Sequence, residues 1–321
     1  MMEDPARFVR RKTVLVAVAA LVILCLGWTT GCSADRGAGP DRGGTMTSSN
    51  SSSVTASSAN PTLSVGSGSR TPSPGSASNR SGGVAPPPAG AAFDYQLGGP
   101  YAPPDGVRVV SRDRTAPPAA GLYNICYVNA FQAQPDALDW WRSNHPDLLL
   151  HRDGRRVIID ANWNEALLDT STAARRAALA AIVDAWIYGC AASGFQAVEP
   201  DNLDSFERSD GLLTAADNAA FAQLINRRAH ADGLAVGQKN TTELLGQRAS
   251  IGFDFAVTEE CGAYDECAGF ASVYDGRVYD IEYSDSGLVK ACAGWRGRIS
   301  IVRRDQDVSP AGEDGYRYGT C

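Results

Sequence analysis

Short apolar segments alternate with polar or helix-like segments from residue 93 to residue 305. A short apolar run bounded by turn residues is typical of a buried strand, and strands that alternate with helices form parallel sheets. Eight such runs occur, at residues 93–97, 107–111, 122–128, 195–198, 234–237, 253–257, 278–281 and 299–302. The pattern predicts an α/β fold with one (β/α)8 barrel of the TIM type. A doubly wound open sheet is the alternative, but no glycine-rich phosphate loop follows the first run.

Three segments between the strands have helical periodicity. Residues 173–193 place apolar side chains three and four positions apart, and the preceding Thr-Ser-Thr at 170–172 offers N-caps. Residues 216–231 repeat the pattern and stop at an Asp-Gly pair. A shorter helix is expected over residues 242–248.

The N-terminal part of the chain has a different composition. Residues 1–31 combine basic residues, an apolar run and a small-residue end, as in an export signal. Gly31-Cys32 resembles a lipoprotein processing site, so Cys32 is predicted to be lipidated and to hold the protein on a membrane. An uncleaved anchor and free secretion are the alternatives. Residues 32–90 are rich in Ser, Gly and Pro and predict a flexible linker, which leaves residues 91–321 as the folded domain.

Cysteine content agrees with a location outside the cytoplasm. Six of the eight cysteines lie in the domain, and an even number in an exported chain favours disulfides. Cys261 and Cys267 face each other across one short loop and are predicted to pair, with buried free thiols as the alternative. The histidines are scattered and no spacing indicates a zinc site, so neither a metal nor a cofactor is expected.

The charge of the domain restricts the class of partner. Residues 91–321 hold 21 basic and 32 acidic residues, a net charge near −11. Such a domain is a poor match for nucleic acid. It would attract a cationic substrate by electrostatic steering, although ordinary solubility also accounts for the charge.

Polar and ionisable residues follow nearly every predicted strand. Because the C-terminal ends of barrel strands form one rim, these side chains are expected to gather in a cleft. Asp201 follows the fourth strand and Glu259 the sixth, a separation that could place their carboxyls on either side of one sugar bond. We therefore expect this pair to perform glycosidic hydrolysis, with the retaining and inverting mechanisms both open.

Other strand-end residues are candidates for binding the substrate. Lys239 could form a Schiff base, but between carboxylates it is better explained as a fixed cation that orients them. Glu199 could point into the barrel, and Asp204 could bind sugar hydroxyls or cap a loop. The full set of expected substrate-binding residues is Gln96, Asp113, Tyr127, Glu199, Asn202, Asp204, Lys239, Asn240, Glu282 and Tyr283.

Three segments carry a family resemblance. Residues 194–204 (GFQAVEPDNLD), 229–240 (AHADGLAVGQKN) and 253–267 (FDFAVTEECGAYDEC) resemble glycoside hydrolase family 114, the endo-α-1,4-polygalactosaminidase family. Residues 278–283 and 94–97 fit its seventh and first strands. The resemblance implies a TIM-type barrel that cleaves a galactosamine-containing polysaccharide without a cofactor, with Asp201 and Glu259 as the catalytic acids.

Two departures from the family pattern affect the expected substrate. Val110 replaces the first of two aspartates on the second strand, while Asp113 keeps the second. Residues 129–134 (NAFQAQ) replace a Ser-Ala-Gly-Ser-Tyr-Glu-like stretch after the third strand. The alternatives are therefore a glycosidase acting on another exopolysaccharide and a non-catalytic carbohydrate-binding lipoprotein on the same barrel. A deacetylase or lyase has little support.

Overall fold

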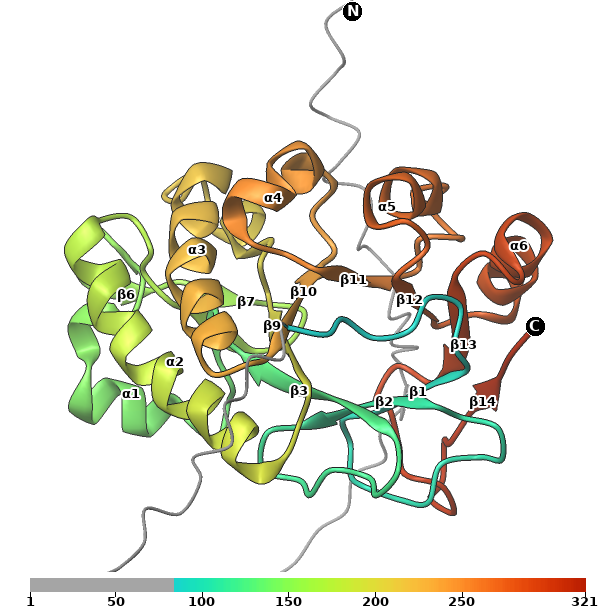
Figure 1. The fold of residues 1–321 in the computed structure, drawn as a ribbon. Coiled ribbons are helices and arrows are strands. Elements are labelled where there is room, and N and C mark those ends of the chain that lie inside the picture. The colour runs from blue at the N-terminus through green and yellow to red at the C-terminus, as the bar shows by residue number, and fades with distance from the viewer. Residues whose placement is uncertain (1–83) are drawn as a thin grey trace, which may run out of the picture. The chain divides into compact units, whose positions relative to one another are not determined.

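The computed structural model describes residues 84–321, which form one α/β domain around a parallel sheet (Figure 1). The sheet order is β1-β2-β3-β9-β10-β11-β12-β13, with the short β14 antiparallel to β13. The strands are β1 (Phe93–Gln96), β2 (Val109–Asp113), β3 (Tyr123–Asn129), β9 (Ala197–Asp201), β10 (Ala235–Lys239), β11 (Phe255–Glu259), β12 (Val278–Glu282), β13 (Ser300–Arg304) and β14 (Tyr318–Gly319). All eight expected strands are confirmed, most of them running a few residues further toward the C-terminus than predicted.

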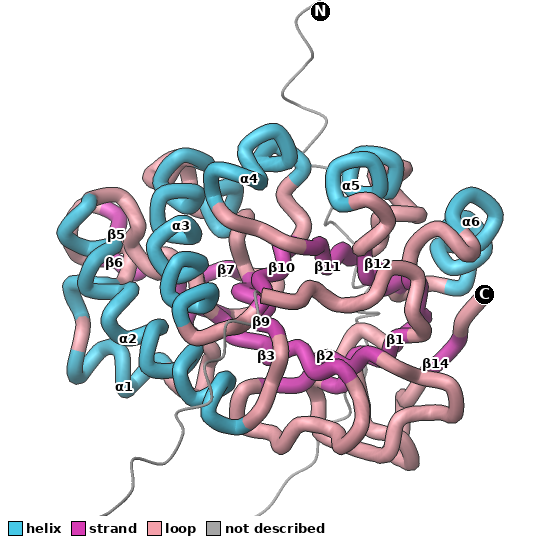
Figure 2. The backbone as a smooth tube through the Cα atoms, in the orientation of Figure 1, coloured by secondary structure: helices cyan, strands magenta, loops and turns pink. Residues whose placement is uncertain are grey.

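The sheet is strongly curled and TIM-like, and its two ends approach each other (Figure 2). At this junction the guanidinium of Arg304 in β13 lies 3.2 Å from the carboxylate of Asp94 in β1, and both side chains are fully buried. The first half of the sheet departs from the regular alternation, because loops rather than helices connect β1 to β2 and β2 to β3.

Helices cover the outside of the second half of the sheet (Figure 1). The helix α2 (Ala173–Ser193) has the predicted bounds, and Thr172 accepts a hydrogen bond from the Arg175 amide as its N-cap. The helix α3 (Ala215–Ala231) begins with a reciprocal capping box between Thr214 and Asp217. The remaining helical segments after β9 are η3 (Ser205–Arg208), η4 (Thr242–Gln247), α4 (Arg248–Ile251), α5 (Cys267–Tyr274) and α6 (Asp285–Trp295).

An insertion between β3 and α2 forms one side of the domain. It contains β4 (Gln132–Ala133), α1 (Leu138–Asn144), η2 (Pro146–Leu148), β5 (His151–Arg152), β6 (Arg156–Val157), β7 (Ile159–Asp160) and β8 (Glu165–Leu167). The strands β4, β8 and β7 form a small antiparallel sheet. The sequence pattern did not predict this sheet, because its strands are only two or three residues long.

The core has two apolar layers, one on the inner face of the curled sheet and one between its outer face and the helices. Phe93, Ile125 and Tyr279 belong to the inner layer, whereas the outer layer packs the opposite strand faces against α2 and α3. Gly237 allows the inner layer to close, because a Cβ there would lie 2.8 Å from the ring of Phe255. Buried apolar side chains on both faces are what a parallel sheet under helices requires.

Three disulfides hold the domain together: Cys126–Cys190, Cys261–Cys267 and Cys292–Cys321. The predicted Cys261–Cys267 pair is confirmed, and none of the six domain cysteines is a free thiol. Disulfides of this number indicate a protein that folds outside the cytoplasm.

Residues just before 91 contact the folded domain. Tyr123 donates a hydrogen bond to the carbonyl of Ala85, and Tyr279 donates one to the carbonyl of Pro88. The last residues of the expected linker therefore pack on the domain. The predicted export signal over 1–31, Cys32 and most of the linker lie outside the described residues. Within residues 84–321, no helix is long and apolar enough to span a membrane.

Candidate active site

The pleat of the strands determines which strand-end side chains meet. Alternate residues of a strand point to opposite faces, so residues two or four positions apart share a face. Three ionisable residues share the inner face with buried apolar residues of their own strand: Asp201 with Ala197, Lys239 with Ala235, and Glu259 with Val257. They therefore converge at the C-terminal rim of the sheet.

Lys239 is the hub of this group. Its Nζ lies 2.9 Å from Asp201 Oδ1, 3.5 Å from Glu259 Oε2 and 3.2 Å from Glu199 Oε1, and its side chain is only 2% exposed. Burial alone would lower the pKa of Lys239, but the three carboxylates outweigh it and hold that pKa well above its usual value. Lys239 is thus a permanent cation. Its burial among three carboxylates is what a fixed cation that orients them requires.

Asp201 is held as a carboxylate. Tyr127 donates a 2.6 Å hydrogen bond to Oδ2, and Lys239 donates one of 2.9 Å to Oδ1. Burial opposes the charge, but Lys239 and the Tyr127 hydroxyl lower the pKa of Asp201 below its ordinary value. Asp201 is therefore ionised at neutral pH, with its side chain 16% exposed.

Glu259 lies opposite Asp201 and is the more accessible of the two. Asn240 donates a 2.9 Å hydrogen bond to its Oε2, and Tyr283 donates one of 2.7 Å to its Oε1. Asn240 Oδ1 also accepts a 2.8 Å hydrogen bond from the backbone N–H of Glu259, so the side-chain amide of Asn240 is fixed in one orientation. The side chain of Glu259 is 25% exposed, so it can reach a ligand in the rim.

The two carboxyls are close enough to act on one bond. Since Asp201 Oδ1 and Glu259 Oε2 lie 2.9 Å and 3.5 Å from the same nitrogen, they are separated by at most the sum of those distances, 6.4 Å. Retaining glycosidases place their carboxyls about 5–5.5 Å apart, and inverting enzymes roughly 6.5–9.5 Å. This limit on the oxygen–oxygen distance is compatible with the retaining spacing.

Glu199 lies beneath this pair and has no solvent access. Tyr95 and Ser111 each donate a 2.8 Å hydrogen bond to it, one to each carboxyl oxygen. Burial raises the pKa of Glu199, although Lys239 and both hydroxyls favour its charged form. The expected substrate contact is corrected: Glu199 is a support for Lys239. The inward parity of Tyr95 and Ser111 was the signal that could have placed these two partners in the site.

Asn202 and Asp204 belong to a network at the edge of the site. Asn202 has a left-handed backbone with φ 64°, and Arg208 donates hydrogen bonds of 3.0 Å to Asn202 and 2.9 Å to Asp204. The Asn202 amide nitrogen in turn donates to Asn129 at 3.1 Å and to Glu165 at 3.3 Å. Glu165, from the insertion, was not among the predicted site residues, because no regular pattern connects it to the strand ends.

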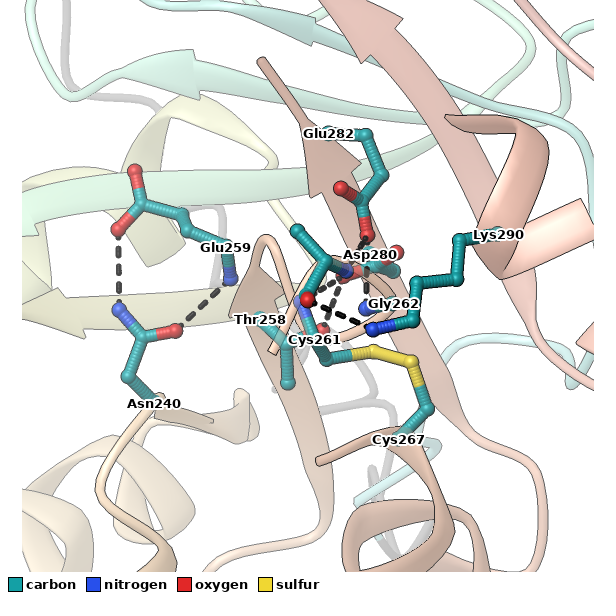
Figure 3. The surroundings of a disulfide bond; sticks show 10 residues. Asn240, Thr258, Glu259, Cys261, Gly262, Cys267, Asp280, Glu282 and Lys290 are labelled. Atoms are coloured by element: carbon teal, nitrogen blue, oxygen red, sulfur yellow. Dashed lines mark hydrogen bonds between the residues drawn. A yellow bond between two sulfur atoms is a disulfide. The ribbon is translucent and has the colours of Figure 1, made fainter. Parts of the chain in front are cut away.

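Glu282 faces away from the cleft, on the outer face of β12. Its Oε1 accepts a 2.7 Å hydrogen bond from the backbone N–H of Gly262 (Figure 3). It also accepts one of 3.3 Å from the backbone N–H of Ala263. Its side chain is fully buried, and a Cβ on Gly287 would collide with its other oxygen. The predicted substrate contact is corrected: Glu282 anchors the loop that follows Glu259.

Asp280 supports the same loop. It accepts hydrogen bonds from the Thr258 hydroxyl at 2.9 Å and the Cys261 amide at 3.1 Å. Burial and the neighbouring Glu282 raise the pKa of Asp280 well above its usual value. Asp280 Oδ2 and Glu282 Oε2 are both buried without another partner, which favours a proton shared by the two carboxyls. In Figure 3, Glu259 points toward Asn240 and away from this acid pair and the Cys261–Cys267 disulfide.

Gln96 and Asp113 have different surroundings. Gln96 is fully buried, donates to Asp94 at 2.8 Å and accepts from Arg112 at 2.9 Å, which corrects its expected place in the cleft. Asp113 lies at the end of β2 and lines a pocket of about 210 Å³ together with Asn129. Other residues around this pocket include Gln132, Trp140, Trp141 and Trp186.

One group of side chains in the described chain has the composition of a metal site. Within residues 84–321, only one cluster brings three side chains of metal-binding types together: Cys261, Cys267 and Asp280. The two sulfurs are bonded to each other, so neither offers a thiolate. The arrangement is a disulfide packed on a carboxyl.

The sequence of the folded domain matches the model of one enzyme family. The model of glycoside-hydrolase family GH114 matches residues 73–321. The chain belongs to glycoside-hydrolase family GH114. The predicted resemblance is thereby confirmed, and this GH114 chain is a glycoside hydrolase.

Solved structures resemble the fold of this GH114 hydrolase. Ega3 of Aspergillus fumigatus, solved in complex with galactosamine, is 22% identical with a TM-score of 0.61, and the match covers 76% of this chain and 100% of Ega3. The glycoside hydrolase domain of PelA from Pseudomonas aeruginosa is 17% identical with a TM-score of 0.49, covering 71% and 98% of the two chains. No protein with curated annotation matches the sequence. Because the two sequences are only 22% identical, the match to Ega3 is evidence for the TIM-like fold alone.

Proposed function

We propose that this hydrolase cleaves glycosidic bonds in a galactosamine-containing polysaccharide by double displacement, with Asp201 as nucleophile and Glu259 as general acid and base. One observation carries the assignment: the Lys239 ammonium lies within 3.5 Å of both carboxyls at one rim. Two carboxyls that differ in environment are what the two roles need.

The environments support this division of roles. Asp201 has a lowered pKa and two strong donors, so it is present as the attacking carboxylate. In the first step Asp201 bonds to the anomeric carbon while protonated Glu259 gives its proton to the departing oxygen. In the second step Glu259 takes a proton from water, the water oxygen bonds to the same carbon, and Asp201 is released.

The substrate class rests on charge and likeness. The net charge of the domain near −11 suits a partly deacetylated, cationic polymer. Ega3, which shares the fold, was solved with galactosamine. A closed TIM-type barrel over residues 91–321, with helices outside only its second half, is the arrangement we propose. Its subsites along the rim would include Asp113, Tyr127, Asn202, Asp204, Asn240 and Tyr283.

The N-terminal residues complete the proposal. Residues 1–31 would direct export, and Cys32 would carry the lipid. The linker over 32–90, apart from its last residues on the domain, would form a tether with an end-to-end distance of roughly 40 Å as a flexible coil. The hydrolase would then act on polysaccharide near the surface of the cell that exports the enzyme.

Reducing-end release from a panel of polymers tests the proposal. We expect the full-length protein to release reducing ends from deacetylated galactosaminan, and Asp201→Asn and Glu259→Gln to lower kcat roughly a thousandfold or more. Product NMR should show retained anomeric configuration. Binding without release would favour the carbohydrate-binding alternative, and release from another polymer alone would favour a different specificity.

A further inference from the structure

Glu165 is a carboxyl of the insertion that reaches the catalytic rim. It begins β8, and its Oε2 accepts hydrogen bonds of 2.9 Å from Asn129 Nδ2 and 3.3 Å from Asn202 Nδ2. Asn202 directly follows Asp201, and Asn129 is the register partner of Asp201 on β3. One amide side chain therefore connects Glu165 to the backbone beside the proposed nucleophile on each of these two strands.

The orientation of Glu165 is fixed by charged neighbours. Arg208 holds the carbonyl oxygen of Asn202, so the amide nitrogen of Asn202 must point toward Glu165. Arg208 is itself paired with Asp160 at 2.6 Å and Asp204 at 2.9 Å. Its charge is thus already balanced by two carboxylates.

Glu165 has hydrogen-bond donors but lacks a cation of its own. Asn129 and Asn202 donate to its Oε2, and Gln132 also does so, at 2.8 Å, in the amide orientation that satisfies its neighbours. Within residues 84–321, no Lys, Arg or His nitrogen forms an ion pair with either oxygen of Glu165. Glu199, by contrast, has an ammonium at 3.2 Å. A half-buried carboxylate near Asp201 with one uncommitted oxygen is electrostatically suited to receive a positive group from a ligand.

The chemistry of an amino sugar supplies such a group next to the reacting atom. In a 2-amino-2-deoxyhexose the ammonium is on the carbon adjacent to the anomeric carbon that Asp201 would attack. A carboxylate one amide side chain away from the nucleophile is therefore in the region where this ammonium would lie. An acetamido group in the same place is neutral and bulkier, and would leave the carboxylate without a cation.

We propose that Glu165 recognises the primary ammonium of the hexosamine bound at Asp201, and so makes the enzyme selective for de-N-acetylated substrate. This inference rests on the proposed function and names the residue that determines its substrate. Glu165 acts by binding, and the bond-breaking steps stay with Asp201 and Glu259.

The titration of Glu165 provides a second signature. Burial, with Asp201 and Asp160, raises the pKa of Glu165 to about 7, while Asn129 and Arg208 oppose that rise. The carboxyl is therefore mostly protonated at pH 6 and mostly ionised at pH 7.5. Ammonium recognition should strengthen as pH rises through this interval and then weaken at higher pH, where the sugar amine loses its own proton.

The experiment compares de-N-acetylated and N-acetylated galactosamine oligosaccharides of equal length on the full-length protein. We expect Glu165→Gln, which keeps an oxygen for Asn129 and Asn202, to raise KM about tenfold for the de-N-acetylated oligomer, with little change in kcat. The N-acetylated oligomer should be affected little. The rise of kcat/KM between pH 6 and 7.5 should vanish for Glu165→Gln and be partly kept in Glu165→Asp.

The controls separate this inference from the proposed function. Asp275→Asn removes one negative charge at the end of α5, where the side chain is 96% exposed, and should leave the preference unchanged. Equal loss on both oligomers, or a preference that survives Glu165→Gln, would overturn the role of Glu165 while leaving the hydrolase standing. Failure of the wild-type protein to cleave either oligomer would overturn both proposals.

Discussion

The Tyr127 hydroxyl donates a 2.6 Å hydrogen bond to Asp201 Oδ2, from the neighbouring strand β3. On the other side of the site, Tyr283 makes the equivalent bond to Glu259 at 2.7 Å. Each proposed catalytic carboxyl thus has one phenol donor of its own. The two donors allow the two carboxyls to be perturbed separately.

Tyr127→Phe should move the acidic limb of the pH profile. The bond favours the charged form of Asp201, so its loss raises the pKa of that carboxyl. A hydrogen bond to a charged group is worth about 1.5–3 kcal/mol, which corresponds to at least about a tenfold loss of kcat/KM on the acidic side. Steady-state kinetics from pH 4 to 7 measure the shift. Tyr188→Phe, at a side chain 58% exposed on α2, is the matched control, and an unmoved acidic limb would contradict this role of Tyr127.

Lys239→Met should destabilise the fold in a pH-dependent way. The substitution leaves Glu199, Asp201 and Glu259 close together without their cation. Removing one partner of a buried ion pair costs about 3–5 kcal/mol. Lys239 lowers the pKa values of Asp201 and Glu199, so both rise in the variant. The deficit should therefore be largest near pH 7 and shrink toward pH 4.5, where these two carboxyls take up protons.

Urea denaturation of wild type and Lys239→Met at both pH values measures this deficit. Lys290→Met is the control, because that ammonium is half exposed in its pair with Asp265. A deficit independent of pH would mean that lost packing, rather than charge, accounts for the effect of Lys239→Met.

Asp280→Asn should remove the loss of stability that Asp280 causes in the wild type as pH rises. The asparagine oxygen still accepts the hydrogen bonds from Thr258 and Cys261. Its side-chain N–H can donate to Glu282 at any pH, whereas the aspartate can donate only when it is protonated. In the wild type the folded-state pKa of Asp280 is raised, so its contribution to stability is complete below about pH 4, the unfolded pKa, and declines as pH rises. The variant should therefore gain in Tm over the wild type as pH rises from 4.5 to 8. A constant Tm difference across that range would exclude the shared proton.

The disulfides should divide into one that stabilises the domain and one that serves the site. Cys126–Cys190 joins residues 64 apart in sequence and Cys261–Cys267 residues 6 apart. The loop-closure model gives about 4 kcal/mol for the first and about 2 kcal/mol for the second. Replacing both cysteines of each pair by alanine should therefore lower the free energy of unfolding more for the first pair.

Activity should follow the opposite order. The Cys261–Cys267 loop directly follows Glu259, so its double alanine variant should lose more kcat per kcal/mol of lost stability. Chemical denaturation and kinetics on the two variants test both halves of the prediction. Equal activity in the two variants would show that the loop after Glu259 does not depend on its disulfide.

Much of the site could be read from local sequence because strands and their ends are local features. The apolar runs placed Asp201, Lys239 and Glu259 at strand ends, and parallel strands bring such ends to one rim. The spacing of Cys261 and Cys267 likewise indicated their bond. These conclusions needed only the period of a strand and the length of a loop.

The tertiary structure decided which face each strand-end side chain takes and what the insertion contributes. Glu282 ends its strand as Glu259 does, yet the pleat turns it outward to a buried loop anchor. Glu165 meets Asn129 across 36 residues of chain and Asn202 across 37. Such meetings depend on the packing of segments distant in sequence, for which a period of two or 3.6 residues carries no information.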